Sequence, residues 1–231
     1  MSKWRVLVAD DDMIVRRSLE ASLLIDGFEV VTANDGEEAI EKVEQRWPDI
    51  AVLDLHMPGM SGFELADRLR RVIEIPVIML TSASDESTTV RGLEEHADDY
   101  VTKPFRYAEL RARINRLLAR SYEGGLHPGE RVVVDEQLVI DFGHRVATLR
   151  NEKIKLTPIE ARILFILLQN QNRIVPTGTL LRKAWGFGEE GDQSSLWVRM
   201  RKLRTKIEPD PDEPRYIHTE RGIGYCFRRP E

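Results

Sequence analysis

Short, mainly apolar runs alternate with amphipathic segments through the first half of the chain. Five such runs lie at residues 5–9, 28–33, 50–53, 76–80 and 100–102. Runs without alternation are typical of strands buried on both faces of a sheet. Between them, apolar residues recur with helical spacing, as in Val15, Leu19 and Leu23. Five strands alternating with five helices predict a doubly wound α/β fold, a five-stranded parallel sheet with strand order 2-1-3-4-5.

The pattern changes after a segment rich in glycine and proline. Residues 121–130 contain three glycines and one proline, so we expect a linker, flexible in its glycine part, between domains at 1–120 and 131–231. Four strand-like runs follow at residues 132–134, 138–140, 146–149 and 153–156. They predict a small antiparallel sheet at the start of the second domain.

Three helices and a hairpin are expected in the rest of this α+β domain. The first helix begins at Pro158, because Thr157 suits the N-cap and Glu160 completes a capping box. The other helices and the hairpin strands are expected at residues 177–185, 193–207, 216–219 and 224–228. This order predicts a helix-turn-helix followed by a wing.

Composition limits the class of protein. The 231 residues are 42% hydrophobic and 32% charged, as in soluble globular proteins of about two domains. The longest apolar stretch, residues 163–168, is far shorter than the roughly 20 residues of a membrane helix, and the N-terminus does not resemble a signal peptide. The single cysteine, Cys226, fits a reducing cytoplasm. We therefore expect a cytoplasmic protein that does not bind membranes.

Charge differs between the two halves. Residues 1–120 carry a net charge of −7, whereas residues 121–231 carry +2. We expect the halves to have different partners.

Aspartates follow the ends of two predicted strands. Asp10, Asp11 and Asp12 follow the first strand, and Asp54 follows the third. The carboxyl ends of these strands meet at the ligand-binding edge of a doubly wound sheet. Carboxylates placed this close favour a bound cation, for which Mg²⁺ is the natural candidate. Asp12 also suits the N-cap of the following helix.

Two further side chains are expected at the same edge. Thr81 ends the fourth strand and Lys103 ends the fifth. A hydroxyl and an ammonium group facing a metal-bound carboxylate form a phosphoryl-binding arrangement. The carboxylate would attack phosphorus and form an aspartyl-phosphate.

These residues lie in motifs that resemble a known domain. The motifs are VLVADDD at 6–12, LDLHMPGMSG at 53–62, LTSA at 80–83 and ADDYVTKPF at 97–105. They are similar to the CheY-like receiver domain of two-component response regulators, over about residues 3–120. The resemblance implies that Asp54 accepts a phosphoryl group from a cognate histidine kinase. It implies Mg²⁺ bound by Asp10, Asp11, Asp54 and the backbone carbonyl of His56, with Thr81 and Lys103 binding the phosphoryl oxygens.

The same resemblance implies a switch and a dimer. Thr81 and Tyr100 would reorient on phosphorylation, and the Lys103–Pro104 bond would be cis. A homodimer would form on phosphorylation through the fourth helix, the fifth strand and the fifth helix. The charged residues of that face are Arg91, Asp98, Asp99, Glu109, Arg113 and Arg120.

The segment 193–207 places cations opposite an apolar stripe. The stripe consists of Leu196, Met200, Leu203 and Ile207, so one face is buried and the other is basic. Such a helix fits the major groove of double-stranded DNA, and an arginine at a hairpin tip fits the minor groove.

The second domain also carries a resemblance. Its motifs are LTPIE at 156–160, LLRKAWG at 180–186, VRMRKLRTKI at 198–207 and PRYIHTERGIGY at 214–225. Residues 131–231 resemble the winged-helix output domain of the OmpR/PhoB subfamily, which implies binding to DNA repeats and control of transcription. The implied DNA-binding residues are Ser195, Val198, Arg199, Arg201, Lys202, Arg204 and Arg221.

Two further features of the second domain are the loop before the recognition helix and a tryptophan within that helix. The resemblance implies that the loop at residues 186–192 contacts RNA polymerase. Trp197 departs from the usual pattern of the recognition helix, and we expect it to pack against the chain rather than stack at the interface.

Two other functions remain open. The receiver could act without phosphorylation. Alternatively, residues 6–14 also fit the opening motif of a haloacid-dehalogenase-type phosphohydrolase with Asp10 as nucleophile, but Asp54 would then have no role. We expect a transcription regulator rather than an enzyme, with at most self-phosphorylation from small donors and autodephosphorylation.

Overall fold

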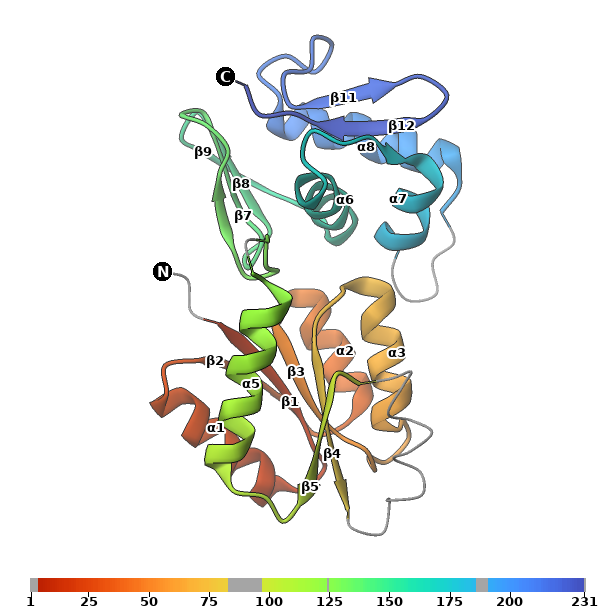
Figure 1. Cartoon of the computed structure of the whole chain (residues 1–231). Coiled ribbons are helices and arrows are strands. Elements are labelled where there is room, and N and C mark those ends of the chain that lie inside the picture. The colour runs from red at the N-terminus through yellow and green to blue at the C-terminus, as the bar shows by residue number, and fades with distance from the viewer. Residues whose placement is uncertain (1–3, 83–96, 124, 186–190, 231) are drawn as a thin grey trace. The chain divides into compact units, whose positions relative to one another are not determined.

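The computed structural model describes residues 4–82, 97–123, 125–185 and 191–230 (Figure 1). Contacts divide the chain into two compact units. They comprise Met1–Arg70 with Glu74–Gly129, and Arg71–Ile73 with Glu130–Glu231. They are called the N-terminal unit and the C-terminal unit below. No helix among the described residues is long and apolar enough to cross a membrane.

The N-terminal unit is built on a five-stranded parallel sheet with the predicted order, β2-β1-β3-β4-β5. The strands are β1 (Arg5–Ala9), β2 (Glu29–Ala33), β3 (Ile50–Asp54), β4 (Val77–Ser82) and β5 (Asp99–Lys103). Both β1 and β3 are buried along their whole length. This burial explains why their sequences lack polar alternation.

Helices cover both faces of this sheet (Figure 1). The described ones are α1 (Met13–Ile25), α2 (Gly36–Gln45), α3 (Gly62–Val72) and α5 (Tyr107–Ser121). Helices α1 and α5 share one face, where Leu19, Leu23 and Leu110 join the buried cluster around Val8 and Val52. The fourth helix expected before β5 falls at residues 83–96, outside the described residues.

The segment that follows α5 is tied to the N-terminal unit. The buried Asp49 carboxylate accepts hydrogen bonds from the backbone N–H groups of Arg5 (2.7 Å) and Gly129 (2.8 Å), and its Oδ1 lies 2.9 Å from Nδ1 of His127. Tyr122 donates its hydroxyl proton to the Asp49 carbonyl. A buried carboxylate needs such donors, so Tyr122, His127 and Gly129 are held against the N-terminal unit on either side of the glycine pair.

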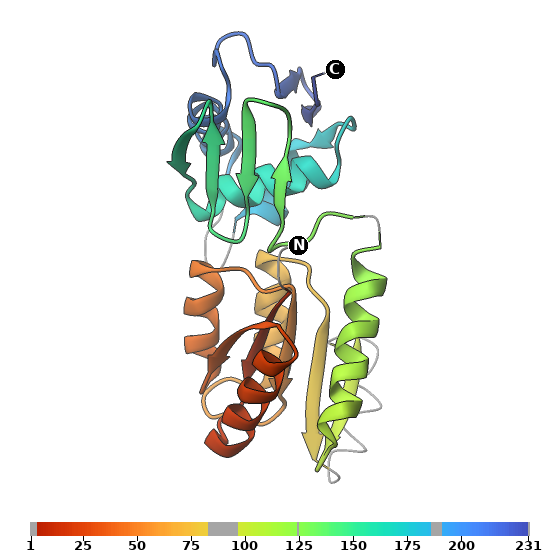
Figure 2. The same cartoon turned by 90° about the vertical axis from the view of Figure 1, so that its left-hand side faces the viewer.

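The C-terminal unit begins with a four-stranded antiparallel sheet of order β6-β7-β8-β9 (Figure 2). Its strands are β6 (Arg131–Val133), β7 (Leu138–Asp141), β8 (Val146–Leu149) and β9 (Glu152–Lys155). The helices that follow are α6 (Pro158–Gln169), α7 (Thr177–Ala184) and α8 (Gln193–Ile207). The expected capping box of α6 is confirmed, since Thr157 and Glu160 bond each other's backbone N–H groups.

The wing has one strand more than the sequence predicted. β10 (Val175–Pro176), β12 (Gly224–Phe227) and β11 (Ile217–Glu220) form a three-stranded sheet in that order. A side chain at Gly224 would place its Cβ 2.0 Å from the Val175 carbonyl oxygen. Glycine is therefore what allows β10 to approach β12.

Candidate functional site

Three carboxylates meet at the carboxyl edge of the parallel sheet. Side-chain oxygens of Asp10, Asp11 and Asp54 lie within 4.8 Å of one another. Asp10 is fully buried and Asp54 is 7% exposed, whereas Asp11 is exposed to solvent. Hard oxygen ligands at this spacing suit a Mg²⁺ ion with part of its water shell retained. The donor set therefore fits the metal expected from the sequence.

Asp12 is directed away from this group. It is the N-cap of α1, where its carboxylate accepts hydrogen bonds from the N–H groups of Ile14 (2.8 Å) and Val15 (3.4 Å). The expected N-cap is therefore confirmed. The cap also fixes the start of α1, and the Asp12 N–H in turn donates to Oδ1 of Asp10 (2.9 Å).

Lys103 brings the positive charge to the cluster. Its ammonium nitrogen lies 2.8 Å from Oδ2 of Asp10 and 3.1 Å from Oδ1 of Asp54. Burial would lower the pKa of Lys103, but the hydrogen bonds to the two aspartates outweigh it and raise that pKa. The amine is therefore held in its charged form.

The environment of Asp54 makes its ionised form less stable than in water and so raises its pKa. Burial raises the pKa of Asp54, and the negative charges of Asp10 and Asp11 add to the increase. The hydrogen bond and charge of Lys103 act in the opposite direction without cancelling it. A divalent cation in the cluster would stabilise the ionised carboxylate, which is the nucleophilic form.

The other residues expected at the site lie around this edge. Thr81 is buried in β4, the strand beside β3, and Tyr100 lies half-buried in β5. Burial raises the pKa of Tyr100. His56 lies two residues after Asp54 with an exposed side chain. The Lys103–Pro104 peptide bond is cis, as expected.

Gly62 lies directly against the backbone of Asp54. It opens α3, and its N–H donates to the Leu55 carbonyl (3.0 Å). A Cβ at this position would lie 2.3 Å from the backbone oxygen of Asp54. Only glycine leaves room for this close approach. The sequence motif contained Gly62, but nothing in the pattern indicated this contact.

The charged residues expected at the dimer face form ion pairs within one chain. Asp99 contacts Arg113 (2.8 Å) and Arg116 (2.6 Å), and Arg113 also contacts Glu109 (2.7 Å). The hydrogen bonds of Arg113 to Glu109 and Asp99 raise its pKa, and the bond to Glu109 has the larger effect. Arg116 was missed, although its i+3 spacing from Arg113 would have shown it.

The other residues expected at that face are Asp98, Arg120 and Arg91. The carboxylate of Asp98 accepts a hydrogen bond from the N–H of Val77 (2.8 Å). Arg120 lies in the last turn of α5. Arg91 lies outside the described residues.

Helix α8 coincides with the predicted recognition helix. Leu196, Met200, Leu203 and Ile207 are its buried residues, as predicted. Arg201 and Lys202 are exposed, Arg199 is half-buried, and Val198 is 43% exposed. Its basic face is therefore open to a ligand for part of its length.

Some polar side chains of α8 already have partners within the C-terminal unit. Ser195 forms a capping box with Asp192. The Arg204 guanidinium donates to the Ile217 carbonyl (2.7 Å) and to the Thr219 hydroxyl (2.7 Å), and burial lowers its pKa. Ser195 thus fixes the start of α8, and Arg204 ties α8 to the wing. The sequence predicted DNA contacts for both residues but not these structural roles.

The wing turn carries Arg221. This residue is exposed between β11 and β12, next to Gly222, whose φ of +76° suits glycine. The Ile223 N–H donates to the Glu220 carbonyl (3.0 Å) and closes the turn. The predicted hairpin with a glycine in its turn is thereby confirmed.

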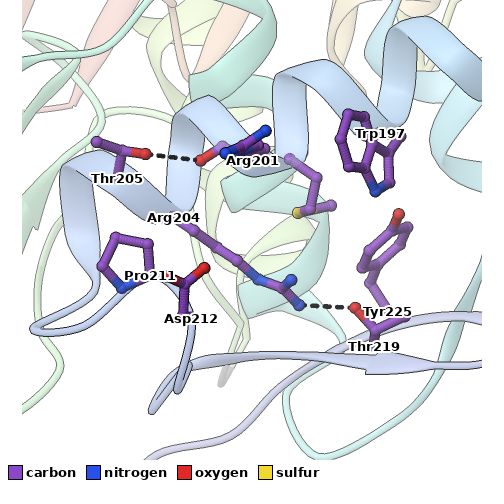
Figure 3. A pocket seen from close by; sticks show the side chains of 9 residues that line it. Trp197, Arg201, Arg204, Thr205, Pro211, Asp212, Thr219 and Tyr225 are labelled. Atoms are coloured by element: carbon purple, nitrogen blue, oxygen red, sulfur yellow. Dashed lines mark hydrogen bonds between the residues drawn. The ribbon is translucent and has the colours of Figure 1, made fainter.

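A pocket of about 440 Å³ opens between α8 and the wing (Figure 3). It is lined by Trp197, Met200, Arg201, Arg204, Thr205, Pro211, Asp212, Thr219 and Tyr225. Trp197 is 56% exposed. The expectation that this ring packs against the chain was therefore wrong, because the buried stripe of α8 is already filled by its neighbours Leu196 and Met200.

Comparison with known proteins gives one consistent family. Residues 6–115 match the family model described as response regulator receiver domain, and residues 151–227 match transcriptional regulatory protein, C terminal. The chain is 38% identical to the probable transcriptional regulator ycf27 of Porphyridium aerugineum, over 99% of this chain and 98% of that protein. It is 36% identical to the DNA-binding response regulator MtrA of Mycolicibacterium smegmatis, over 96% of both.

A solved structure also covers nearly the whole chain. The response regulator DrrB of Thermotoga maritima, described as an OmpR/PhoB homologue, is 31% identical and covers 98% of this chain and 99% of its own, with a TM-score of 0.47.

Proposed function

Because this chain belongs to the OmpR/PhoB-type response regulators, we propose that it controls transcription in response to phosphorylation of Asp54 by a histidine kinase. One observation carries the proposal. Side-chain oxygens of Asp10, Asp11 and Asp54 gather within 4.8 Å, and the Lys103 ammonium contacts Asp10 and Asp54. This arrangement suits a carboxylate that must accept a phosphoryl group, since it supplies metal ligands and a cation to one reaction centre.

The chemistry follows from the positions of these groups. Asp10, Asp11, Asp54 and the backbone carbonyl of His56 would hold Mg²⁺, which supplies charge neutralisation when bound. An oxygen of Asp54 forms a bond to phosphorus as the bond from phosphorus to the donor breaks, and the donor keeps the electron pair. Lys103 and the Thr81 hydroxyl bind the phosphoryl oxygens.

Phosphorylation then changes the conformation of the receiver. Thr81 and Tyr100 are the switch pair, and phosphorylation stabilises an active conformation that already exists in the ensemble. Receivers pair through the face that carries Asp99, Glu109 and Arg113. The exposed pair of Arg113 with Glu109 contributes only about 0–1 kcal/mol, so it exchanges readily for an intermolecular pair.

The C-terminal unit binds DNA as the output. Helix α8 enters the major groove and Arg221 reaches the minor groove, so that a dimer contacts two repeats. The contacts come from Val198, Arg199, Arg201 and Lys202, with Ser195 and Arg204 bonded within the unit beside them. The segment 186–192, of which 186–190 lie outside the described residues, is the proposed contact to RNA polymerase. The protein would act in the cytoplasm.

The decisive experiment is intact-mass analysis after incubation with acetyl phosphate and Mg²⁺. The wild type should gain the mass of one phosphoryl group, and Asp54→Asn should not. An adduct that survives Asp54→Asn but requires Asp10 would instead support a phosphohydrolase. A wild type that gains no adduct from acetyl phosphate or from a histidine kinase would support a regulator that acts unphosphorylated.

A further inference from the structure

Trp197 and its neighbour Val198 are both exposed to solvent on helix α8. Trp197 is 56% exposed, and it stands beside Val198, which is 43% exposed. A single exposed apolar residue is ordinary on a protein surface, but here two consecutive residues of a basic helix leave apolar side chains open to a ligand. Both belong to the first two turns of α8, where a recognition helix contacts base edges.

The Trp197 ring also contacts a cation. The guanidinium carbon of Arg201, one helical turn further on, lies 5.8 Å from the centroid of the ring. This distance falls within the range of a cation–π interaction. The contact restricts the Arg201 side chain to one side of α8 and so orders it before a ligand arrives.

The pocket beside the ring has two chemically different ends (Figure 3). Trp197 and Tyr225 lie at one end, and Pro211 and Asp212 lie at the other. Arg204 lies between them, with its guanidinium bonded to the wing at Thr219. The carboxylate of Asp212 disfavours a phosphate group at its end of the pocket, whereas Trp197 and Tyr225 bring no negative charge to the aromatic end.

We propose that Trp197 is a specificity-determining residue, whose ring contacts the C5 methyl group of one thymine in the major groove while Arg201, ordered by the same ring, contacts the neighbouring base pair. The proposal rests on the DNA binding proposed above. Apolar side chains distinguish thymine through this methyl group, and arginine distinguishes guanine through O6 and N7. A contact to sugar or phosphate would instead carry no sequence information.

The test uses the full-length protein, acetyl phosphate, Mg²⁺ and a pool of randomised DNA duplexes. The wild type selects a motif, and each thymine of that motif is then replaced in turn by deoxyuridine, which lacks only the C5 methyl. Binding of the wild type should weaken about fourfold at one thymine, the worth of one buried methyl group. Trp197→Ala should bind the thymine and deoxyuridine duplexes equally.

Matched variants separate this contact from its neighbours. Trp197→Phe keeps an aromatic ring and should retain most of the methyl effect. Val133→Ala removes an apolar side chain that is 62% exposed in β6 and should behave as the wild type. Circular dichroism should show Trp197→Ala folded, because the ring it removes is largely exposed.

The outcomes distinguish this proposal from the one it rests on. If the wild type selects no motif, sequence-specific DNA binding fails and this inference fails with it. If the wild type selects a motif but Trp197→Ala keeps the methyl effect, only the role of Trp197 is overturned. A methyl effect that disappears in Val198→Ala and persists in Trp197→Ala would move the contact to Val198 and overturn it equally.

Discussion

The ammonium group of Lys103 lies 2.8 Å from Oδ2 of Asp10 and so joins residues 93 positions apart in the sequence. Asp10 follows β1, an interior strand of the sheet, and Lys103 ends β5 at its edge. The same nitrogen lies 3.1 Å from Oδ1 of Asp54. One cation therefore contacts two buried carboxylates that would also be ligands of a metal ion.

Removing this cation should make the N-terminal unit depend on metal. Lys103→Met leaves Asp10 buried without its counter-ion, which costs about 2–4 kcal/mol of unfolding free energy in EDTA. Added Mg²⁺ should restore more stability to the variant than to the wild type, because the metal no longer competes with an ammonium group. Urea titration with hydrogen exchange of the β1 and β3 peptides measures both effects.

The control for this prediction is an exposed ion pair in the same unit. Arg68 contacts Glu37 and Glu64 at the surface of α3, so Arg68→Met should cost less than about 1 kcal/mol and should not respond to Mg²⁺. Equal losses in both variants would contradict the role given to Lys103.

The close approach of Gly62 to Asp54 gives a second prediction. Gly62→Ala places a Cβ 2.3 Å from the Asp54 backbone oxygen, so the chain around Asp54 must shift. We expect a loss of about 1–3 kcal/mol in unfolding free energy and slower phosphorylation by acetyl phosphate. Gly125→Ala, where a Cβ meets nothing within 4 Å, should change neither the stability nor the rate measured by intact mass.

The sheet and its edge were predictable because buried parallel strands leave a strong pattern. The strand order follows from the doubly wound alternation of strands and helices. The gathering of Asp10 and Asp54 and the N-cap of α1 follow from which residues end which strand. The close contact beneath Gly62 was not predictable, because it depends on the path of the chain between β3 and α3. β10 was missed because two residues are too short to show a period.

The sequence also could not predict which way each basic side chain of α8 points. Its basic residues recur along the helix, and their spacing does not show which of them meets a buried acceptor. Arg204 turns to the Ile217 carbonyl, and Lys206 turns to Glu160. Trp197 was expected to pack against the chain, but its ring is 56% exposed, and the buried residues of α8 are Leu196, Met200, Leu203 and Ile207.

Lys206 should therefore act on stability rather than on DNA binding. Its ammonium nitrogen lies 2.6 Å from Oε2 of Glu160, whose side chain is 2% exposed. Lys206→Met leaves that carboxylate buried with only the Thr157 N–H as partner and without its counter-ion, and should cost about 3 kcal/mol. Lys202→Met, at an exposed position of the same helix, should cost little stability and should weaken DNA binding instead. Hydrogen exchange of the α6 and α8 peptides and a DNA titration distinguish the two variants.

Asp135 should make the C-terminal unit sensitive to acid. Burial alone would raise the pKa of Asp135, but the N–H groups of Gln137 and Leu138 and the Tyr216 hydroxyl hold it below its ordinary value of 3.8. A carboxyl group with a lowered pKa in the folded state stabilises fully above its ordinary pKa, and this stabilisation is lost as the pH falls through the lowered value. Asp135→Asn should therefore be less stable than the wild type at pH 6, by about 1–2 kcal/mol, and the difference should shrink below pH 4. Hydrogen exchange of the β7 and β11 peptides, corrected for the intrinsic effect of pH, measures the difference, and a gap that stays constant down to pH 2 would contradict the assignment.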